Sequence, residues 1–467
     1  MSKPISIFNE ILGPVMRGPS SSHTAAAYRI GQIARQCLKN GLKKVSVSCS
    51  TQGSLPTTYH SQGSQTGLLA GLTGIPIEAE EIKDILDIYK EKGLEEELIV
   101  NDEPCSHPNT YELAITDSKG INTYIKAIST GGGMIKVTRI NDCDVNIEGD
   151  TYVNIEGIGT LSPILPIHYN NKANLPFVDA SGFETYFPKT NKEMWEYALE
   201  YEAERGGISK DDVWEIAKEI LHTMRKSLQT GLAGTDYNDR ILGQQFHLID
   251  EGVAKNKLIP STLTNRIIKY ALAIMECKSS FGVIVAAPTA GSCAVVPSAI
   301  LACADEYGID EDTCIKSLLA AGLIGLFIAK DSTISAEVGG CQAECGAGSG
   351  MAAAAIAQMM GGNSHECLSA ASFALQNILG MVCDPIAKRV EAPCLGKNIM
   401  CSMNAISSAN IALAGVDILI PLSEVICAMN QTGKAICPEL RCTGLGGLSV
   451  CKTSLRIEKS LDSTKLI

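Results

Sequence analysis

The chain has 467 residues, of which 45% are hydrophobic and 19% charged, and its formal net charge is −12. This length is enough for two or three domains with a sizeable core. No basic run is longer than a few residues, so we expect no nucleic-acid partner.

The N-terminus lacks a basic head followed by a long apolar stretch, so we expect no signal peptide and a cytoplasmic protein. Eighteen cysteines without such a leader indicate a reducing compartment rather than a disulfide framework. Two apolar segments, 281–304 and 318–329, resemble membrane spans. The first is interrupted by Pro288, Gly291 and Pro297, and the second is too short to cross a bilayer. We therefore expect both to lie in a protein core, and no membrane partner.

Residues 1–180 predict a small α/β domain. Helical periodicity covers 25–38 and 64–72, and 44–49 alternates as a strand. Three glycines at 131–133 permit a tight turn between two of the later strand-like runs. These runs are 121–128, 134–140, 145–147 and 152–155.

The second half of the chain predicts helices. Residues 158–190 are rich in Pro, Asn and Gly, which indicates a linker. Residues 190–193 predict a capped helix start, and 195–205 and 211–230 have amphipathic spacing. Helical runs continue nearly to residue 431, interrupted by loops at 287–292, 331–350, 380–398 and 430–447. The sequence thus predicts an α+β protein, with an α/β domain over 1–180 and a mostly α-helical domain over 190–467.

Three cysteines lie in small-residue sequence near glycine or proline: Cys341 in GGCQAE, Cys383 in VCDP and Cys394 in APCLGKN. Their intervals of 42 and 11 residues are too wide for one compact finger and suit a 4Fe–4S cluster. With only three thiolates, one iron stays open and can act as a Lewis acid. For any one cysteine, a buried structural thiol is the competing interpretation. Cys345 could share a helical face with Cys341, so the spacing leaves open which of these two binds metal.

A run of hydroxyl residues, GPSSSHT at 18–24, precedes the first expected helix. Hydroxyls and exposed N–H groups at a helix start can bind a carboxylate, and histidine titrates near neutrality. The competing interpretation is an ordinary serine N-cap followed by an exposed histidine. The residues concerned are Ser20, Ser21, Ser22, His23 and Thr24.

Two further polar segments interrupt apolar sequence. AAPTAGS at 286–292 predicts either tight packing or a ligand contact. Residues 330–345 combine hydroxyls, carboxylates, a lysine and two thiols after a helix.

Taken together, these motifs resemble the iron–sulfur-dependent bacterial L-serine dehydratase (L-serine ammonia-lyase) family. The resemblance covers almost the whole chain and is carried by motifs in family order. They are GPSSSHT at 18–24, GSL at 53–55, GGG at 131–133, AAPTxG at 286–291, SxISAExGGCQ at 332–342, CDP at 383–385, PCxxxN at 393–398, MNQTG at 429–433 and GGL at 446–448.

The resemblance implies a small α/β domain, a helical catalytic domain, no pyridoxal phosphate and a 4Fe–4S cluster on Cys341, Cys383 and Cys394. It implies dehydration and deamination of L-serine to pyruvate and ammonia, a reaction of amino-acid degradation and gluconeogenesis. We expect His23 to act as the base or to bind substrate. We expect Ser20, Ser21 and Ser22 to hold the carboxylate, with Thr24 in the same catalytic segment. Further substrate contacts are expected at Thr289, Gly291, Ser335 and Asn398.

The chain departs from the family pattern where substrate is handled. Gln62 and Gln65 stand where the family typically has histidine and aspartate, and Ala290 stands in place of an asparagine. Family chains often end in a cysteine soon after GGL, whereas here Cys451 follows GGL and the tail runs on to Ile467. Polar groups of a site decide which substrate is accepted. We therefore expect the cluster chemistry to be kept and the pocket to be roomier.

Several alternatives remain open from the sequence. The substrate could be L-threonine, L-cysteine or a bulkier hydroxy acid. A non-catalytic iron–sulfur sensor is possible, and a zinc site would give a colourless protein. We expect a homodimer, because two-fold dimers are the commonest oligomers.

Overall fold

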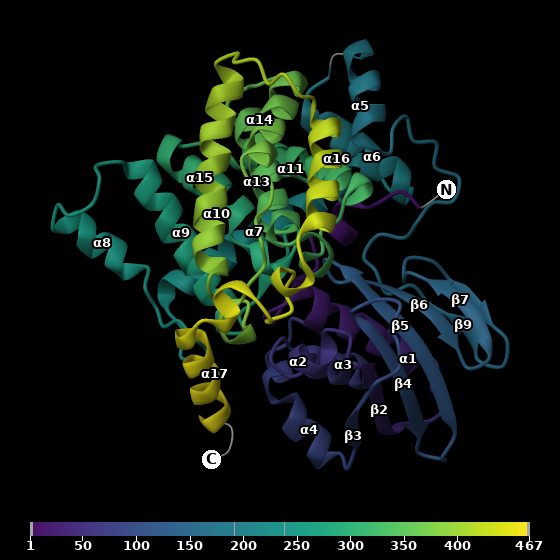
Figure 1. Cartoon of the computed structure of the whole chain (residues 1–467). Coiled ribbons are helices and arrows are strands. Elements are labelled where there is room, and N and C mark those ends of the chain that lie inside the picture. Colours follow the sequence, from purple (N-terminus) through teal and green to yellow (C-terminus); the bar gives the residue numbers. More distant parts are fainter. Residues whose placement is uncertain (1–2, 191, 238, 465–467) are drawn as a thin grey trace. The chain divides into compact units, whose positions relative to one another are not determined.

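The computed structural model describes residues 3–190, 192–237 and 239–464. The chain divides into two compact units (Figure 1). Unit 1 comprises Met1–Val15 together with Asn170–Ile467, and unit 2 comprises Met16–Tyr169. Each unit has its own core.

Unit 2 is built on a six-stranded mixed sheet of order β3-β2-β4-β5-β6-β7. β2 and β3 pair in parallel, and all other neighbours in this sheet are antiparallel. The strands are β2 (Leu42–Ser50), β3 (Glu95–Asn101), β4 (Thr110–Asp117), β5 (Asn122–Gly131), β6 (Met134–Ile140) and β7 (Cys143–Ile147). A separate hairpin joins β8 (Val153–Ile155) to β9 (Gly159–Leu161).

Four helices accompany the sheet of unit 2: α1 (Ala26–Gln36), α2 (Leu55–Thr58), α3 (Ser64–Thr73) and α4 (Ile85–Glu91). α2, α3 and α4 form the crossover that a parallel β2–β3 pair requires. α1 packs against β5, β6 and α3 (Figure 1). Burial alternates along β5, as expected for a strand with one covered face.

Unit 1 is helical. Its helices are α5 (Ala180–Tyr186), α6 (Met194–Gly206), α7 (Lys210–Ala233), α8 (His247–Ala254), α9 (Thr262–Ser279), α10 (Val295–Tyr307), α11 (Glu311–Asp331), α12 (Ala336–Gly339), α13 (Cys345–Met359), α14 (Ser364–Gln376), α15 (Cys394–Leu413), α16 (Leu422–Ala435) and α17 (Lys452–Thr464).

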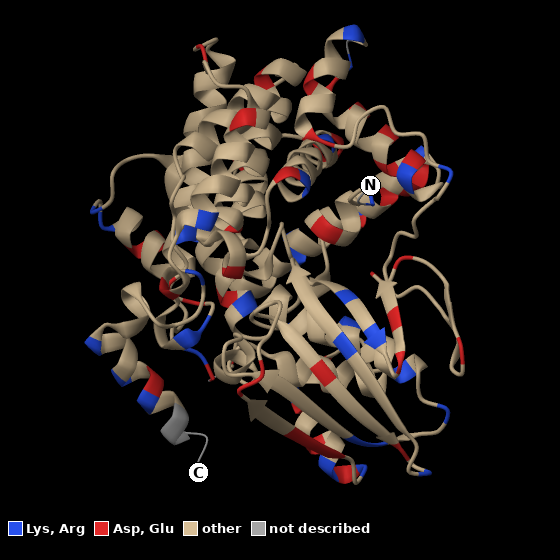
Figure 2. Cartoon of the chain, turned by 45° about the vertical axis from the view of Figure 1, so that its right-hand side comes forward, with Lys and Arg blue, Asp and Glu red and all other residues tan. Residues whose placement is uncertain are grey.

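The core of unit 1 is centred on α13, every residue of which is buried. α10, α11, α14 and α15 pack around it (Figure 1). Its sequence, CGAGSGMAAAAIAQM, is small and apolar on all sides, which suits a helix without a solvent face. Figure 2 shows that the inner helices of unit 1 carry few charged residues, whereas Lys, Arg, Asp and Glu gather on outer helices and loops.

The N-terminal segment belongs to this helical core. Ile7–Ile11 forms a short π-helical turn, and Ile7, Phe8, Ile11 and Leu12 are buried. The turn packs on α11. The chain is therefore not a simple succession of two units, because its first residues complete the second half.

The structure confirms the predicted α+β class, with a small α/β region ahead of a mostly helical region. The three glycines at 131–133 all have positive φ and join β5 to β6 in a tight turn, as predicted. One expectation is corrected, because α5 lies inside the stretch expected to be a linker. The structure also contains two strands, β3 and β4, that are not predicted from the sequence.

The predicted helix start at 190–193 is resolved in part. α6 begins after Glu193, whose capping box with Glu196 satisfies backbone N–H groups at the helix start. Asn191 lies outside the described residues.

α11 is the one described helix that is long and apolar enough to cross a membrane by length and composition. Most of its apolar window, 78%, is buried inside the protein, as expected of a core helix.

Candidate functional site

Two of the predicted metal ligands meet around a carboxylate. One ligand atom from each of Cys341, Glu344 and Cys383 lies within 4.8 Å of the others. Cys341 opens a 3₁₀ turn directly after α12, and Cys383 lies in the loop after α14. Both thiols are buried, and Glu344 is half-buried. Two thiols and a carboxylate at this separation form a set that could hold a metal ion.

Cys394, the third predicted ligand, opens α15 and is not one of the three residues of this group. Asn398 donates from Nδ2 to the Cys394 carbonyl at 2.8 Å and to the Gly291 carbonyl at 2.7 Å. Its Oδ1 accepts from the Ala294 N–H at 3.1 Å. Asn398 therefore connects the start of α15 to the 290–294 segment. Its Nδ2 also lies 3.6 Å from Cys345 Sγ. The substrate-binding role of Asn398 stays a prediction.

Cys345 lies next to Cys341, although the two do not share a helix, because Cys341 is in a 3₁₀ turn and Cys345 begins α13. Their Sγ atoms are 3.9 Å apart, and Cys345 Sγ lies 3.7 Å from the Gly291 carbonyl. Hydrogen bonds from the Cys345 and Cys383 thiols hold the pKa of Cys341 well below its usual range. Thiolates are the form of cysteine that binds metal, so these surroundings suit Cys341 as a ligand.

The Cys383 loop is held from several sides. The Cys383 N–H donates to the Leu440 carbonyl at 2.8 Å, and the Cys442 N–H donates to the Cys383 carbonyl at 2.9 Å. Lys397 Nζ donates to the Val382 carbonyl at 2.7 Å and to Asp384 Oδ1 at 2.8 Å. These contacts bring the CDP, PCxxxN and C-terminal segments together.

Gln342 connects the Cys341 turn to a fourth motif. Its Nε2 donates to the Met429 carbonyl at 2.7 Å, and its Oε1 accepts from the Gly380 N–H at 2.9 Å. Gln342 is buried. It therefore positions the turn that carries Cys341 relative to α16 and the Cys383 loop.

Glu344 is a site residue that the sequence argument missed. Burial raises its pKa to about 8, and the neighbouring Cys341 adds to that shift. A carboxyl group with such a pKa can hold or release a proton near neutrality. The signal was present in the motif itself, since Glu344 follows Cys341 by three residues in GGCQAE.

The other predicted contacts of unit 1 lie around this group. Thr289 Oγ1 lies 3.2 Å from Ser292 Oγ. Gly291 faces Glu344, because a Cβ at this position would lie 3.2 Å from Glu344 Oε2. Ser335 Oγ donates to Glu337 Oε2 at 2.7 Å. Their roles toward substrate stay predictions.

The SSSHT segment of unit 2 forms a π-helical turn, Ser21–Ala25, ahead of α1. The interpretation as a serine N-cap with an exposed histidine is wrong, because Ser20 makes no side-chain cap and His23 is fully buried. Ser20 Oγ lies 3.1 Å from His23 Nδ1. Ser22 offers its carbonyl to the Ser129 hydroxyl at 2.7 Å.

Two of the departures from the family pattern, Gln62 and Gln65, also lie in unit 2. Thr24 Oγ1 donates to the Gln62 carbonyl at 3.0 Å, and the Gln62 side chain is buried. Gln65 bonds His60 Nδ1 at 2.9 Å and donates to Glu96 at 2.9 Å. Gln62 therefore contacts the SSSHT turn through its backbone carbonyl, whereas the Gln65 amide bonds His60 and Glu96.

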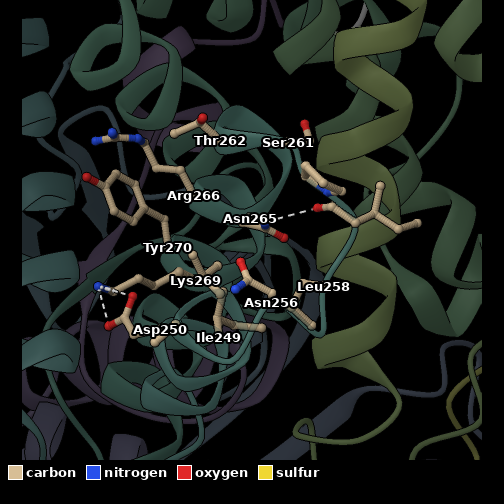
Figure 3. Close-up of a pocket in the computed structure, with 14 residues that line it drawn as sticks. Ile249, Asp250, Asn256, Leu258, Ser261, Thr262, Asn265, Arg266, Lys269 and Tyr270 are labelled. Carbon is tan, nitrogen blue, oxygen red and sulfur yellow. Dashed lines mark hydrogen bonds and ion pairs between the residues drawn. The ribbon is translucent and has the colours of Figure 1, made fainter.

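A separate pocket of about 750 Å³ lies between α8 and α9 (Figure 3). Lys269 pairs with Asp250 there, and Asn265 donates to the Ile259 carbonyl. None of the site residues predicted from the sequence lines this pocket. We therefore place the candidate site at the cysteines.

Two protein families match the chain. The serine dehydratase alpha chain family matches residues 189–449, more than half of the chain, and the serine dehydratase beta chain family matches residues 12–139. An L-serine dehydratase alpha chain of Peptoniphilus asaccharolyticus is 36% identical, covering 57% of this chain and 91% of the relative.

Two relatives match nearly end to end. The L-serine dehydratase of Streptomyces coelicolor is 28% identical over 96% of this chain and 98% of its own length. L-serine dehydratase 1 of Escherichia coli is 27% identical over 93% of this chain and 96% of its own length. The chain belongs to the serine dehydratase family of enzymes.

Proposed function

We propose that this chain is an iron–sulfur-dependent lyase that dehydrates and deaminates L-serine to pyruvate and ammonia. The observation that carries the proposal is the group of Cys341, Cys383 and Glu344. Asn398 links Cys394 to it by contacting both the Cys394 carbonyl and the Cys345 sulfur. The relatives that match nearly end to end are named L-serine dehydratases.

The donor set fits a cluster better than a lone structural zinc. Cys341, Cys383 and Cys394 come from three separate segments whose backbones are held by Gln342, Asn398 and contacts of the Cys383 loop. Burial also excludes water, which favours a cluster held by thiolates. When bound, a 4Fe–4S cluster with one iron free of protein thiolate supplies a Lewis acid for the substrate hydroxyl.

The chain's own groups would then bind the substrate and move protons. Glu344, which lies beside Cys341 and Cys383, is our candidate for giving a proton to the departing hydroxyl. His23, oriented by Ser20 at Nδ1, remains our candidate for removing the α-proton or for binding substrate. For L-serine, loss of water gives an enamine, which tautomerises and hydrolyses to pyruvate and ammonia.

One experiment tests this proposal directly. The purified protein is reconstituted anaerobically with iron and sulfide and assayed on L-serine, L-threonine, L-cysteine and larger β-hydroxy acids. We expect a brown protein that releases pyruvate and ammonia from L-serine and loses activity in air, because an incompletely ligated iron is lost. Ferrous iron with a thiol reductant should restore it. Activity that survives prolonged aeration or needs pyridoxal phosphate would contradict the proposal.

A second candidate is the same chemistry on a bulkier β-hydroxy acid. It is favoured by Ala290, a fully buried residue in the turn next to Gly291, where the family typically has the larger asparagine. Changing Gln62→His and Ala290→Asn together should raise turnover of L-serine if these positions line the pocket. A product assay on L-serine against the bulkier acid separates the two candidates.

A further inference from the structure

A buried lysine lies next to the candidate metal site. Lys278 is in the last turn of α9 and is 1% exposed. α9 packs against α10 and α15. α10 follows the 289–292 turn, and α15 begins at Cys394. Among the residues that the structure describes, Lys278 Nζ makes no hydrogen bond. Burying an amino group without a hydrogen-bond partner lowers the stability of the folded protein, and a bound partner would remove that cost.

The surroundings of Lys278 are acidic and rich in thiols. Burial raises the pKa of Glu391, and the nearby charge of Lys278 opposes that shift. The same holds for Cys394 and for Glu344, whose pKa values are also raised by burial and lowered by Lys278. Lys278 thus acts electrostatically on residues of the candidate site, although its Nζ forms no hydrogen bond with either carboxylate.

The other lysine of the site is already engaged. Lys397 Nζ donates to the Val382 carbonyl and to Asp384, on the loop that carries Cys383. Lys397 is therefore occupied by the loop that carries Cys383. Lys278, by contrast, keeps its ammonium donors for a group that arrives from outside.

We propose that Lys278 binds the carboxylate of the substrate beside the cysteine site. The inference rests on the proposed function, because it assigns Lys278 to the substrate of that reaction. The substrate must then present a carboxylate near the metal. The amide of the same acid lacks this negative charge and should bind poorly. A charge-assisted hydrogen bond in a dry site explains such discrimination.

The test uses the reconstituted protein under anaerobic conditions and the variant Lys278→Met, which keeps the length of the side chain without its charge. L-alanine carries the carboxylate but has no hydroxyl to lose, and L-alaninamide lacks the charge. Calorimetric titration should show that the wild type binds L-alanine and not L-alaninamide. Lys278→Met should weaken L-alanine binding about tenfold or more, and Lys278→Arg should keep part of it.

The matched control is Lys269→Met on the same helix, where Lys269 pairs with Asp250 away from the cysteines. This control should bind L-alanine as the wild type does. Without ligand, Lys278→Met should unfold at the same or a higher temperature, since it removes a buried charge. Equal L-alanine binding by wild type and Lys278→Met, absent binding by the wild type, or lost iron in Lys278→Met would overturn the inference.

Turnover separates this inference from the proposed function. With L-serine, Lys278→Met should raise KM while the iron and sulfide content stays that of the wild type. If the protein turns over no L-serine but binds L-alanine in a Lys278-dependent way, the proposed function fails and the inference stands. If L-serine turnover is unchanged in Lys278→Met, the inference fails and the function stands.

Discussion

Cys341 is the residue on which the proposed metal centre depends most, because it lies within reach of Glu344, Cys345 and Cys383. We expect Cys341→Ala, Cys383→Ala and Cys394→Ala each to abolish the brown colour, the iron content and the activity. A site with three thiolates has no spare ligand. Cys345→Ala should keep the cluster. The measurement is iron and sulfide content with visible absorbance after anaerobic reconstitution.

A remote buried cysteine serves as the control for these variants. Cys367 lies in α14, and its thiol hydrogen-bonds the Gly362 carbonyl at 3.8 Å, so Cys367→Ala should retain the cluster. Loss of the cluster in Cys345→Ala together with retention in Cys341→Ala would move the ligand to Cys345.

Glu202 gives the fold a pH dependence of known sign. It is fully buried in α6 and accepts from the Ser6 hydroxyl and from the Ile7 N–H at 2.8 Å. Burial raises its pKa, and Arg205 with these hydrogen bonds only partly opposes the shift. The folded state therefore binds the proton more tightly than the unfolded chain. The stabilisation is complete below about pH 4.3, the ordinary glutamate value, and is lost as pH rises through the folded pKa.

Urea unfolding of the metal-free protein between pH 4 and pH 8 measures this effect. The free energy of unfolding of the wild type relative to Glu202→Gln should fall as pH rises. Glu200→Gln is the control of opposite sign. Burial alone would raise the pKa of Glu200, but hydrogen bonds from Lys192 and Lys210 lower it overall, so its stabilisation is lost as pH falls. A difference between wild type and Glu202→Gln that does not change with pH would contradict the prediction.

Close packing of helix α11 depends on glycines that admit the N-terminal turn. A Cβ added at Gly325 would lie 2.2 Å from Ile11 Cγ2 and 3.0 Å from Met351 Sδ. Gly325→Ala should therefore lower the free energy of unfolding by about 1–3 kcal/mol, the usual cost of overpacking a core. Gly396→Ala in α15 should leave stability unchanged or raise it by about 0.5 kcal/mol, because no atom lies within 4 Å of its added Cβ.

Thermal and urea unfolding of the metal-free variants compare these two substitutions within one helical unit. If both change stability by the same amount, helix propensity rather than packing would control the outcome. That result would show that α11 can move away from the N-terminal turn at little cost.

The whole chain is organised so that its first residues complete the unit formed by its second half. Met1–Val15 belongs to the same compact unit as Asn170–Ile467. Tyr201 donates to the Ile5 carbonyl at 3.0 Å, and Arg205 donates to the Pro4 carbonyl at 3.0 Å. A fragment of residues 170–467 should therefore be unstable alone.

The expected loss follows from burial of the N-terminal turn. Burying a large aliphatic or aromatic side chain contributes about 1.5–3 kcal/mol, and Ile7, Phe8, Ile11 and Leu12 are all buried. The fragment should lose about 5 kcal/mol or more and expose apolar surface. Fusing residues 1–15 to residue 170 should restore cooperative unfolding, measured by circular dichroism. A fragment as stable as the fusion would contradict this organisation.

The sequence by itself determined the class of the fold and much of the chemistry. Hydrophobic periods of two and 3.6 residues reflect local backbone geometry, so β2, β5, β6, α1 and α6 could be predicted. The cysteines could be singled out by their spacing and by the glycine and proline beside them.

Only the tertiary structure decided what these residues meet. Glu344 becomes a site residue because burial beside Cys341 raises its pKa, and no local pattern encodes burial. Asn398 and Gln342 connect segments that are far apart in the chain. Lys278 looks like an ordinary helix-end lysine in sequence, and its isolation from hydrogen-bond partners follows from the packing of α9 against α10 and α15. Contacts between distant segments depend on close packing of the whole unit. A short stretch of sequence does not specify that packing.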